Sequence, residues 1–201
     1  MLYPLKLNAA FKDYLWGGTR LRYEFNKQTD IDPVAESWEL SCHHDGQSII
    51  SNGEFSGKTL AQYIETVGKQ VIGTKAPKDK DFPILIKFID AKQSLSVQVH
   101  PDDKYALLHE GESGKTEMWY VMDATPDATL IYGFTHEISH QEFERRIKDN
   151  TLLEVCNQVP IKKGDVFFIE AGTLHAIGAG ALIAEIQQSS NSTYRVYDYG
   201  R

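Results

Sequence analysis

Short apolar segments of strand length, separated by turn residues, recur along most of the 201-residue chain. In residues 95–100 (LSVQVH), apolar and polar side chains alternate as in a β-strand with one buried face. Many short strands and few helices predict an antiparallel barrel or sandwich. After a β-rich opening over residues 1–58, the expected strands are residues 84–89, 95–100, 117–122, 128–132, 166–170, 181–187 and 193–199.

Two stretches have helical periodicity instead. Residues 59–70 carry apolar side chains at helical spacing, and Gly73 and Pro77 follow as stop signals. Ser139 and Glu142 have the spacing of a capping box at the start of a second helix. We therefore expect one domain over residues 1–201, with helical segments at about 59–72 and 139–155.

Composition excludes several classes of protein. A net charge of −7 argues against general binding to nucleic acid or to an acidic membrane, since both need a basic surface. Cys42 and Cys156 are too few for a disulfide framework or a cysteine-rich metal site. No run of 18 apolar residues occurs, and the first residues lack the apolar stretch of a signal peptide. A cytoplasmic protein is expected.

Strand alternation in residues 95–100 places Ser96, Gln98 and His100 on one face. Taken alone, this pattern is equally typical of a half-buried strand with a solvated face. It becomes informative only when other segments supply matching residue types.

Two such segments follow. Glu117 opens an apolar aromatic strand, and His175 follows a strand that ends in a turn with Gly172. Either residue alone is more often a surface or structural residue than a ligand. Together with Gln98 and His100 they offer two imidazoles, one carboxylate and one amide oxygen, a donor set suited to Zn²⁺ or a similar divalent ion. Such a site leaves a position open for water or a substrate oxygen.

The order Gly-x5-Glu-x-Gly-x2-His in residues 164–175 resembles the second cupin motif, with Glu170 where proline is more usual. Gln98-x-His100 followed by Glu117 resembles the first cupin motif, with glutamine replacing its first histidine. That replacement is typical of type I phosphomannose isomerases. Segments similar to that family run through the chain in the family's order: DYLWGGTRL, AESWELSC, SLSVQVHPDDKYA, GKTEMWYV, FIEAGTLHAIGAG and EIQQSSNSTYRVYDYGR.

The resemblance implies a mainly β fold, a cupin-type antiparallel β-barrel (jelly roll) with a few accessory helices. It also implies a metal-dependent aldose–ketose isomerase that interconverts mannose 6-phosphate and fructose 6-phosphate through a cis-enediolate. Members of the family are longer and end in a second, smaller barrel. We therefore expect that barrel to be absent from residues 1–201, and an apolar surface to be exposed where it would pack.

The resemblance also implies roles for individual residues. One Zn²⁺ per chain is expected on Gln98, His100, Glu117 and His175. Catalytic roles are expected for Lys115, Glu185 and Arg195, and substrate contacts for Glu36, Ser96 and Arg201. The expected partner is a small sugar phosphate, and the oligomeric state stays open.

Three groups remain candidates for the base that moves the substrate proton: Glu185, Lys115 and a zinc-bound water. Two other functions also remain open. One is a different metallocupin enzyme, such as an oxygen-activating iron enzyme, and the other is an inactive cupin that binds sugar phosphate.

Overall fold

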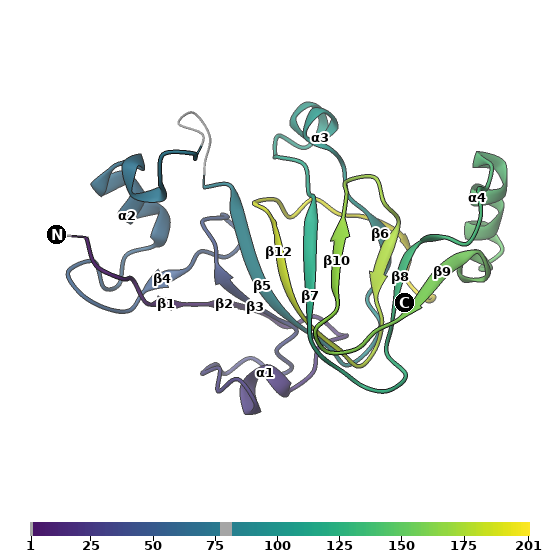
Figure 1. Cartoon of the computed structure of the whole chain (residues 1–201), viewed down its shortest axis with the longest axis horizontal. Coiled ribbons are helices and arrows are strands. Elements are labelled where there is room, and N and C mark those ends of the chain that lie inside the picture. The colour runs from purple at the N-terminus through teal and green to yellow at the C-terminus, as the bar shows by residue number, and fades with distance from the viewer. Residues whose placement is uncertain (1, 77–81) are drawn as a thin grey trace.

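The computed structural model describes residues 2–76 and 82–201, so Pro77 lies outside the described residues. Most elements are β-strands. They form two large antiparallel sheets and a small sheet of β1 (Leu7–Asn8) and β4 (Ile49–Ile50) (Figure 1). The prediction of a mainly β, antiparallel fold with few helices is confirmed.

The larger sheet has six strands in the order β10-β7-β12-β5-β3-β2. These are β2 (Ala10–Lys12), β3 (Glu36–Leu40), β5 (Ile84–Ala91), β7 (Glu117–Ala124), β10 (Val166–Ile169) and β12 (Ala181–Gln188). The register pairs Glu185 on β12 with Lys87 on β5 and with Trp119 on β7. Directly paired residues share a face, so these three side chains lie in one row across the sheet.

The second sheet has five strands in the order β13-β6-β11-β8-β9. These are β6 (Val97–Val99), β8 (Thr129–Phe134), β9 (Cys156–Pro160), β11 (His175–Ile177) and β13 (Tyr194–Tyr197). Strands β9 and β11 were not expected from the sequence. With three residues, β11 is too short for period-two alternation to mark it.

Both stretches with helical periodicity contain helices, which lie at opposite ends of the molecule (Figure 1). Helix α2 (Leu60–Val67) starts with a capping box and is followed by the 3-10 turn η1 (Lys69–Ile72). Helix α4 (His140–Lys148) precedes the 3-10 turn η2 (Leu152–Glu154). Ser139 caps α4, but the Glu142 carboxylate accepts from Arg146 at 2.8 Å and does not close the predicted capping box.

Two short helices were not expected: α1 (Arg20–Tyr23) and α3 (Asp103–His109). The signal for α3 was present in the sequence, because the Asp102 side chain caps it by accepting from the Tyr105 backbone N–H. Within residues 2–76 and 82–201, no helix combines the length and apolar character needed to span a bilayer.

The main apolar core lies between the two large sheets, because both contribute side chains to it. The six-stranded sheet provides Ile89, Trp119, Val121, Ile169 and Ile183, and the five-stranded sheet provides Leu130 and Ile177. Other positions on the same strands are buried but polar or charged. They include Glu36, Lys87, Glu117, Glu185 and Gln187. Such groups need partners inside the protein, so this polar region is a candidate functional site.

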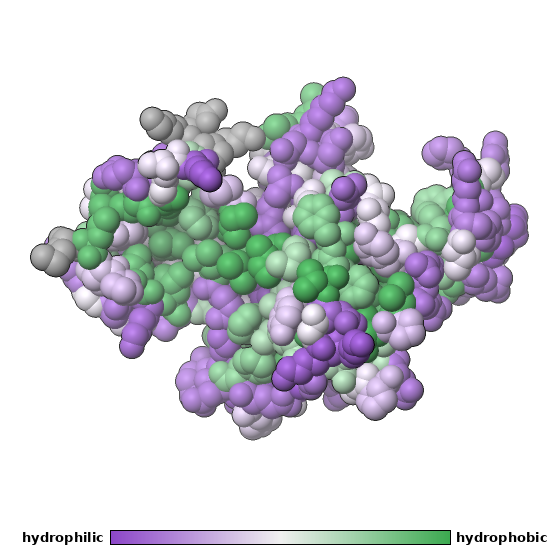
Figure 2. Space-filling view, in the orientation of Figure 1, coloured by the Kyte–Doolittle hydropathy of each residue, from purple (hydrophilic) through white to green (hydrophobic). Residues whose placement is uncertain are grey.

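Apolar side chains also lie on the outer face of β7 and β10, where Tyr120, Val166 and Phe168 are 40%, 60% and 55% exposed. The register places Val166 directly opposite Tyr120. Figure 2 shows hydrophobic residues gathered over this side of the sheet. The expectation that a second barrel covers such a surface in a longer chain stays a prediction.

The segment before α1 is held against β5 by close backbone contacts. Gly17 bridges to Ala91, and the Gln93 N–H donates to the carbonyl of Trp16 at 3.0 Å. A Cβ on Gly17 would lie 2.6–2.9 Å from three atoms of Ala35, two of them backbone. Only glycine fits this position without a shift of the Ala35 backbone.

We predict that Gly17→Ala lowers the free energy of unfolding by about 1–3 kcal/mol, the usual cost of overpacking a rigid contact. Urea denaturation measures this loss. Ala35→Gly removes one of the contacted atoms, so combining both substitutions should recover part of the stability. An unchanged midpoint in Gly17→Ala would show that this contact does not constrain the segment.

Candidate metal centre and active-site pocket

Three buried side chains with metal-ligand chemistry meet where β6 ends and where β7 and β11 begin. His100 follows β6, and Glu117 and His175 are the first residues of β7 and β11. Each is at most 1% exposed. The Nε2 atoms of His100 and His175 lie 3.1 Å apart, and the Glu117 carboxylate oxygens lie 3.3 and 3.6 Å from them. The three groups are close enough to bind one ion.

Backbone carbonyls fix the orientation of both imidazoles. His100 Nδ1 donates to the carbonyl of Ser192 at 3.0 Å, and His175 Nδ1 donates to that of Thr173 at 2.8 Å. A carbonyl only accepts, so each neutral ring carries its proton on Nδ1 and presents the Nε2 lone pair. The two lone pairs therefore converge on the same point.

Burial keeps both imidazoles neutral. It lowers the pKa of His100 to about 4, with a further contribution from the nearby Lys115 charge, and it also lowers the pKa of His175. Neutral imidazole is the form that binds metals. Both rings are thus ready to act as ligands at neutral pH.

The carboxylate of Glu117 is the negative member of this cluster. Burial opposes its ionisation, but the Lys115 ammonium, 2.8 Å from Oε1, and the nearby histidines hold the pKa of Glu117 well below its usual range. Among the described residues, neither Glu117 oxygen has a partner with full hydrogen-bond geometry. A buried anion beside two converging imidazole lone pairs fits a divalent cation, so the residues present match the expected metal.

The predicted fourth ligand, Gln98, lies in the same region. On β6 it is directly opposite His175 on β11 and Arg195 on β13. Opposite residues share a face, so the three side chains project to the same side of the sheet. Ser96 Oγ donates to Gln98 Oε1 at 3.5 Å, the limit of a hydrogen bond.

A pocket of about 230 Å³ adjoins the cluster. Gln98 and Lys115 line it, and Lys115 Nζ is also 3.1 Å from His100 Nε2. The pocket wall brings together all the residues that the sequence analysis assigned to catalysis or substrate contact: Glu36, Ser96, Lys115, Glu185, Arg195 and Arg201. Residues from six strands, and from the segments between and after them, thus line one cavity.

Sequence analysis missed two charged residues of this pocket, Asp198 and the buried Lys87. Lys87 is 3% exposed, and its Nζ lies 3.6 Å from Glu36 and 3.6 Å from Glu185. Burial alone would lower the pKa of Lys87, but the two facing carboxylates outweigh it and raise the pKa above the usual value. The sequence did contain an indication of this role, because Lys87 interrupts the apolar run of residues 84–89. A charged residue in a central strand is rarely buried without a partner.

Two tryptophans hold the carboxylates that flank Lys87. Trp38 Nε1 donates to Glu36 at 2.6 Å, and Trp119 Nε1 donates to Glu185 at 2.8 Å. Even so, burial and then the charge of Glu117 raise the pKa of Glu185 to about 7. Glu185 is thus a fixed carboxyl group that changes protonation state near neutral pH.

The two arginines of the pocket differ in their contacts. Arg201 donates to the Ser94 carbonyl at 2.7 Å and to the Asp198 carboxylate at 2.8 Å, which fixes its guanidinium. By contrast, Arg195 has no side-chain hydrogen bond or ion pair to the residues that the structure describes. Its guanidinium is therefore available for a ligand.

The fold and the buried cluster place the chain in the cupin class. Residues 4–126 match the family model described as phosphomannose isomerase type I, catalytic domain. This match covers more than half of the chain, so the protein belongs to the type I phosphomannose isomerase family.

Individual relatives agree with this assignment. The chain is 46% identical over 202 residues to the probable mannose-6-phosphate isomerase GmuF of Bacillus subtilis, covering 100% of this chain and 63% of GmuF. It is 44% identical over 203 residues to the mannose-6-phosphate isomerase of Streptococcus mutans, covering 100% of this chain and 62% of that protein. A crystal structure of mannose 6-phosphate isomerase from Bacillus subtilis superposes with a TM-score of 0.92 at 40% identity, covering 100% and 63% of the two chains. The chain thus spans less than two thirds of these relatives.

We predict that the protein binds one equivalent of zinc, and that His100→Ala or His175→Ala abolishes high-affinity binding. Each substitution removes one of two convergent imidazoles, and the ligands that remain are too few to hold the ion tightly. Atomic absorption after dialysis measures the metal content. His44→Ala is the matched control, since His44 has a 74% exposed side chain and lies outside the cluster. Full metal occupancy in both cluster variants would contradict the assignment.

Proposed function

We propose that the protein is a zinc-dependent aldose–ketose isomerase that interconverts mannose 6-phosphate and fructose 6-phosphate. The observation that carries this proposal is the pocket next to the His100–Glu117–His175 cluster, in which a free arginine and a carboxyl group titrating near neutrality face one cavity. The names of the relatives support the choice of substrate.

Local charge supports a phosphorylated substrate. The whole chain carries a net charge of −7, yet the pocket is lined by four cationic side chains against three acidic ones. The cations are Lys87, Lys115, Arg195 and Arg201, and the acids are Glu36, Glu185 and Asp198. An excess of positive charge around a pocket attracts an anion that the rest of the surface repels.

We assign the metal to Gln98, His100, Glu117 and His175. Two imidazoles with oxygen donors and no thiolate suit Zn²⁺ or a similar divalent ion. When bound, the ion supplies Lewis acidity that polarises the sugar carbonyl. Lys115 lies beside this metal site, 2.8 Å from Glu117, and also lines the pocket, where it would contact the substrate.

The reaction moves a proton between C2 and C1 of the open-chain sugar. We assign this transfer to Glu185, because its pKa of about 7 lets it both accept and return a proton at neutral pH. Trp119 holds the carboxyl group in place by donating to it at 2.8 Å. Lys115, with its contacts to His100 and Glu117, is better placed to stabilise negative charge than to act as the base.

Arg195 is assigned to the developing enediolate oxygen. Its guanidinium stays charged, offers several fixed N–H donors and makes no competing contact with the described residues. Ser96 and Arg201 are assigned to the 6-phosphate, whose remote binding energy helps position the reacting carbons. Glu36 acts at the pocket wall, where it holds Lys87 from the side opposite Glu185.

A coupled assay for fructose 6-phosphate formation from mannose 6-phosphate tests the proposal. Turnover should disappear after treatment with a chelator and return when zinc is added. Binding of metal and mannose 6-phosphate without turnover would show instead that residues 1–201 form a sugar-phosphate-binding cupin. Oxygen-dependent turnover with bound iron would point to a different metallocupin enzyme.

We predict that Arg195→Lys retains the fold and the metal but lowers kcat by about 10²–10³, the usual cost of losing a preorganised donor to an oxyanion. An ammonium cannot reproduce the planar, two-pronged contact of a guanidinium. Steady-state kinetics on the zinc-loaded variant measures the effect. A kcat equal to that of the wild type would remove Arg195 from this role.

We predict that kcat/KM falls as the pH drops below about 7, because a base must be deprotonated and burial raises the pKa of Glu185 to about 7. A bound cation would offset the charge of Glu117, so kcat/KM should fall to half of its plateau at about pH 7 or somewhat below. Rates measured at saturating zinc between about pH 5 and about pH 9 locate this midpoint. Glu185→Gln should be nearly inactive at every pH, and wild-type activity in that variant would exclude Glu185 as the base.

A further inference from the structure

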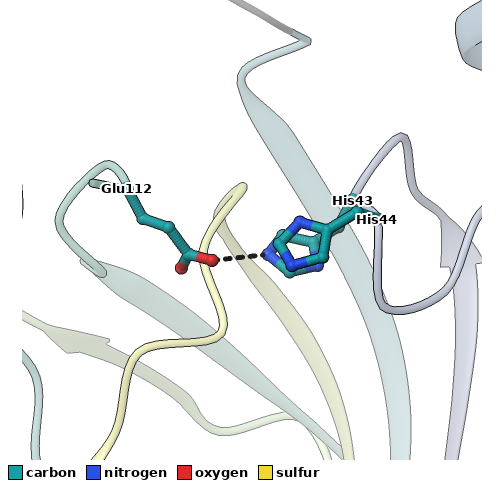
Figure 3. Close-up of side chains that lie close together, drawn as sticks. All are labelled: His43, His44 and Glu112. Carbon is teal, nitrogen blue, oxygen red and sulfur yellow. Dashed lines mark ion pairs between the residues drawn. The ribbon is translucent and has the colours of Figure 1, made fainter. Parts of the chain in front are cut away.

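A second cluster of histidine and carboxylate lies outside the pocket (Figure 3). Glu112, in the loop before β7, points toward the stacked rings of His43 and His44 in the turn after β3. His43 is 6% exposed, and its Nε2 lies 3.3 Å from Glu112 Oε1. In composition alone, the cluster resembles a second metal site.

The hydrogen bonding of His43 argues against metal binding. The backbone N–H of Asp45 donates to His43 Nδ1 at 3.1 Å, so the lone pair of the neutral ring is on Nδ1 and its proton is on Nε2. That proton faces Glu112. This is the reverse of the arrangement in His100 and His175, where Nδ1 donates and Nε2 is free. The Nε2–H lies 3.3 Å from the carboxylate without full hydrogen-bond geometry, and neither ring nitrogen offers a free lone pair to a metal.

The other oxygen of Glu112 contacts a different part of the chain. Glu112 Oε2 accepts from Ser190 Oγ at 3.1 Å, from the Asn191 backbone N–H at 3.1 Å and from Ser192 Oγ at 3.2 Å. All three donors belong to the turn between β12 and β13. One carboxylate thus holds this turn at three points, and the pKa of Glu112 is lowered because these donors outweigh its partial burial.

The same turn reaches the candidate metal centre. The carbonyl of Ser192 accepts from His100 Nδ1 at 3.0 Å and so determines which ring nitrogen is free. Asn191 lines the pocket, and Arg195 follows on β13. A shift of the turn would therefore affect one metal ligand and one predicted catalytic residue together.

We propose that Glu112 is a positioning residue for His100. By holding residues 190–192, it keeps the Ser192 carbonyl where it fixes the ring of His100 with Nε2 toward the metal. The inference rests on the proposed metal site. A group that hydrogen-bonds a metal-bound histidine, as the Ser192 carbonyl does here, sets its orientation and basicity, and the loss of such a group costs about 10–100-fold in metal affinity or activity.

The test compares zinc affinity in Glu112→Ala, Glu112→Gln and the wild-type chain by competition with a chromophoric chelator. We expect about 10–100-fold weaker binding in Glu112→Ala. Glu112→Gln should bind more tightly than Glu112→Ala, because the amide oxygen can still accept from the same donors in the turn. It also keeps the side-chain volume, which guards against misfolding. With Co²⁺ in place of zinc, the visible spectrum of Glu112→Ala should change while its far-UV circular dichroism does not.

Two control variants separate the possible causes. Glu144→Ala removes an exposed glutamate on α4 and should leave zinc affinity unchanged. His43→Ala removes the histidine contact but keeps the donors from the turn, so it should weaken zinc binding far less than Glu112→Ala does.

Zinc affinity in Glu112→Ala equal to that in Glu144→Ala would overturn the proposal. So would a second equivalent of bound zinc in the wild type that is lost in His43→Ala, because Glu112 would then be a metal ligand itself. Failure of the underlying metal site is recognised separately, since His100→Ala would then retain its zinc. Neither readout depends on isomerase activity.

Discussion

The convergence of two imidazole lone pairs on a buried carboxylate is the constraint on which the rest of the site depends. His100 and His175 present Nε2 atoms 3.1 Å apart, beside a Glu117 that has no complete hydrogen bond within the described residues. Burying such a carboxylate costs several kcal/mol unless a cation lies beside it, as the Lys115 ammonium does at 2.8 Å. The three residues come together because β6 ends, and β7 and β11 begin, at the same place in the fold.

A row of paired charges extends from this cluster across the six-stranded sheet. Lys87 lies between Glu36 and Glu185, and buried tryptophans donate to both carboxylates. Inside the protein these charges act on one another strongly, so Glu117 and Lys87 shift the pKa of Glu185 in opposite directions. The proposed base is therefore tuned by the residues that also build the metal site and the pocket wall. Outside this row, the Glu112 network fixes the turn that leads to Arg195.

Much of this arrangement could be predicted from sequence, for identifiable reasons. Period-two alternation marked β6 and β12, and the glutamine and histidine spacing led to the correct family. Strand β11 and helix α3 were missed because one is too short to show a period and the other depends on a single cap at Asp102. Lys87 was missed because its partners lie on β3 and β12, and Glu112 because its role depends on three separate loops. Such contacts arise only when distant segments fold together.

X-ray absorption at the zinc edge tests the central claim most directly, because it reports the ligands of the metal in solution. The account predicts a shell of nitrogen and oxygen atoms at about 2.0–2.2 Å, with the multiple scattering of two imidazoles and no sulfur. A sulfur shell at about 2.3 Å, or the absence of imidazole scattering, would contradict it. Either result would place the metal away from His100, Glu117 and His175.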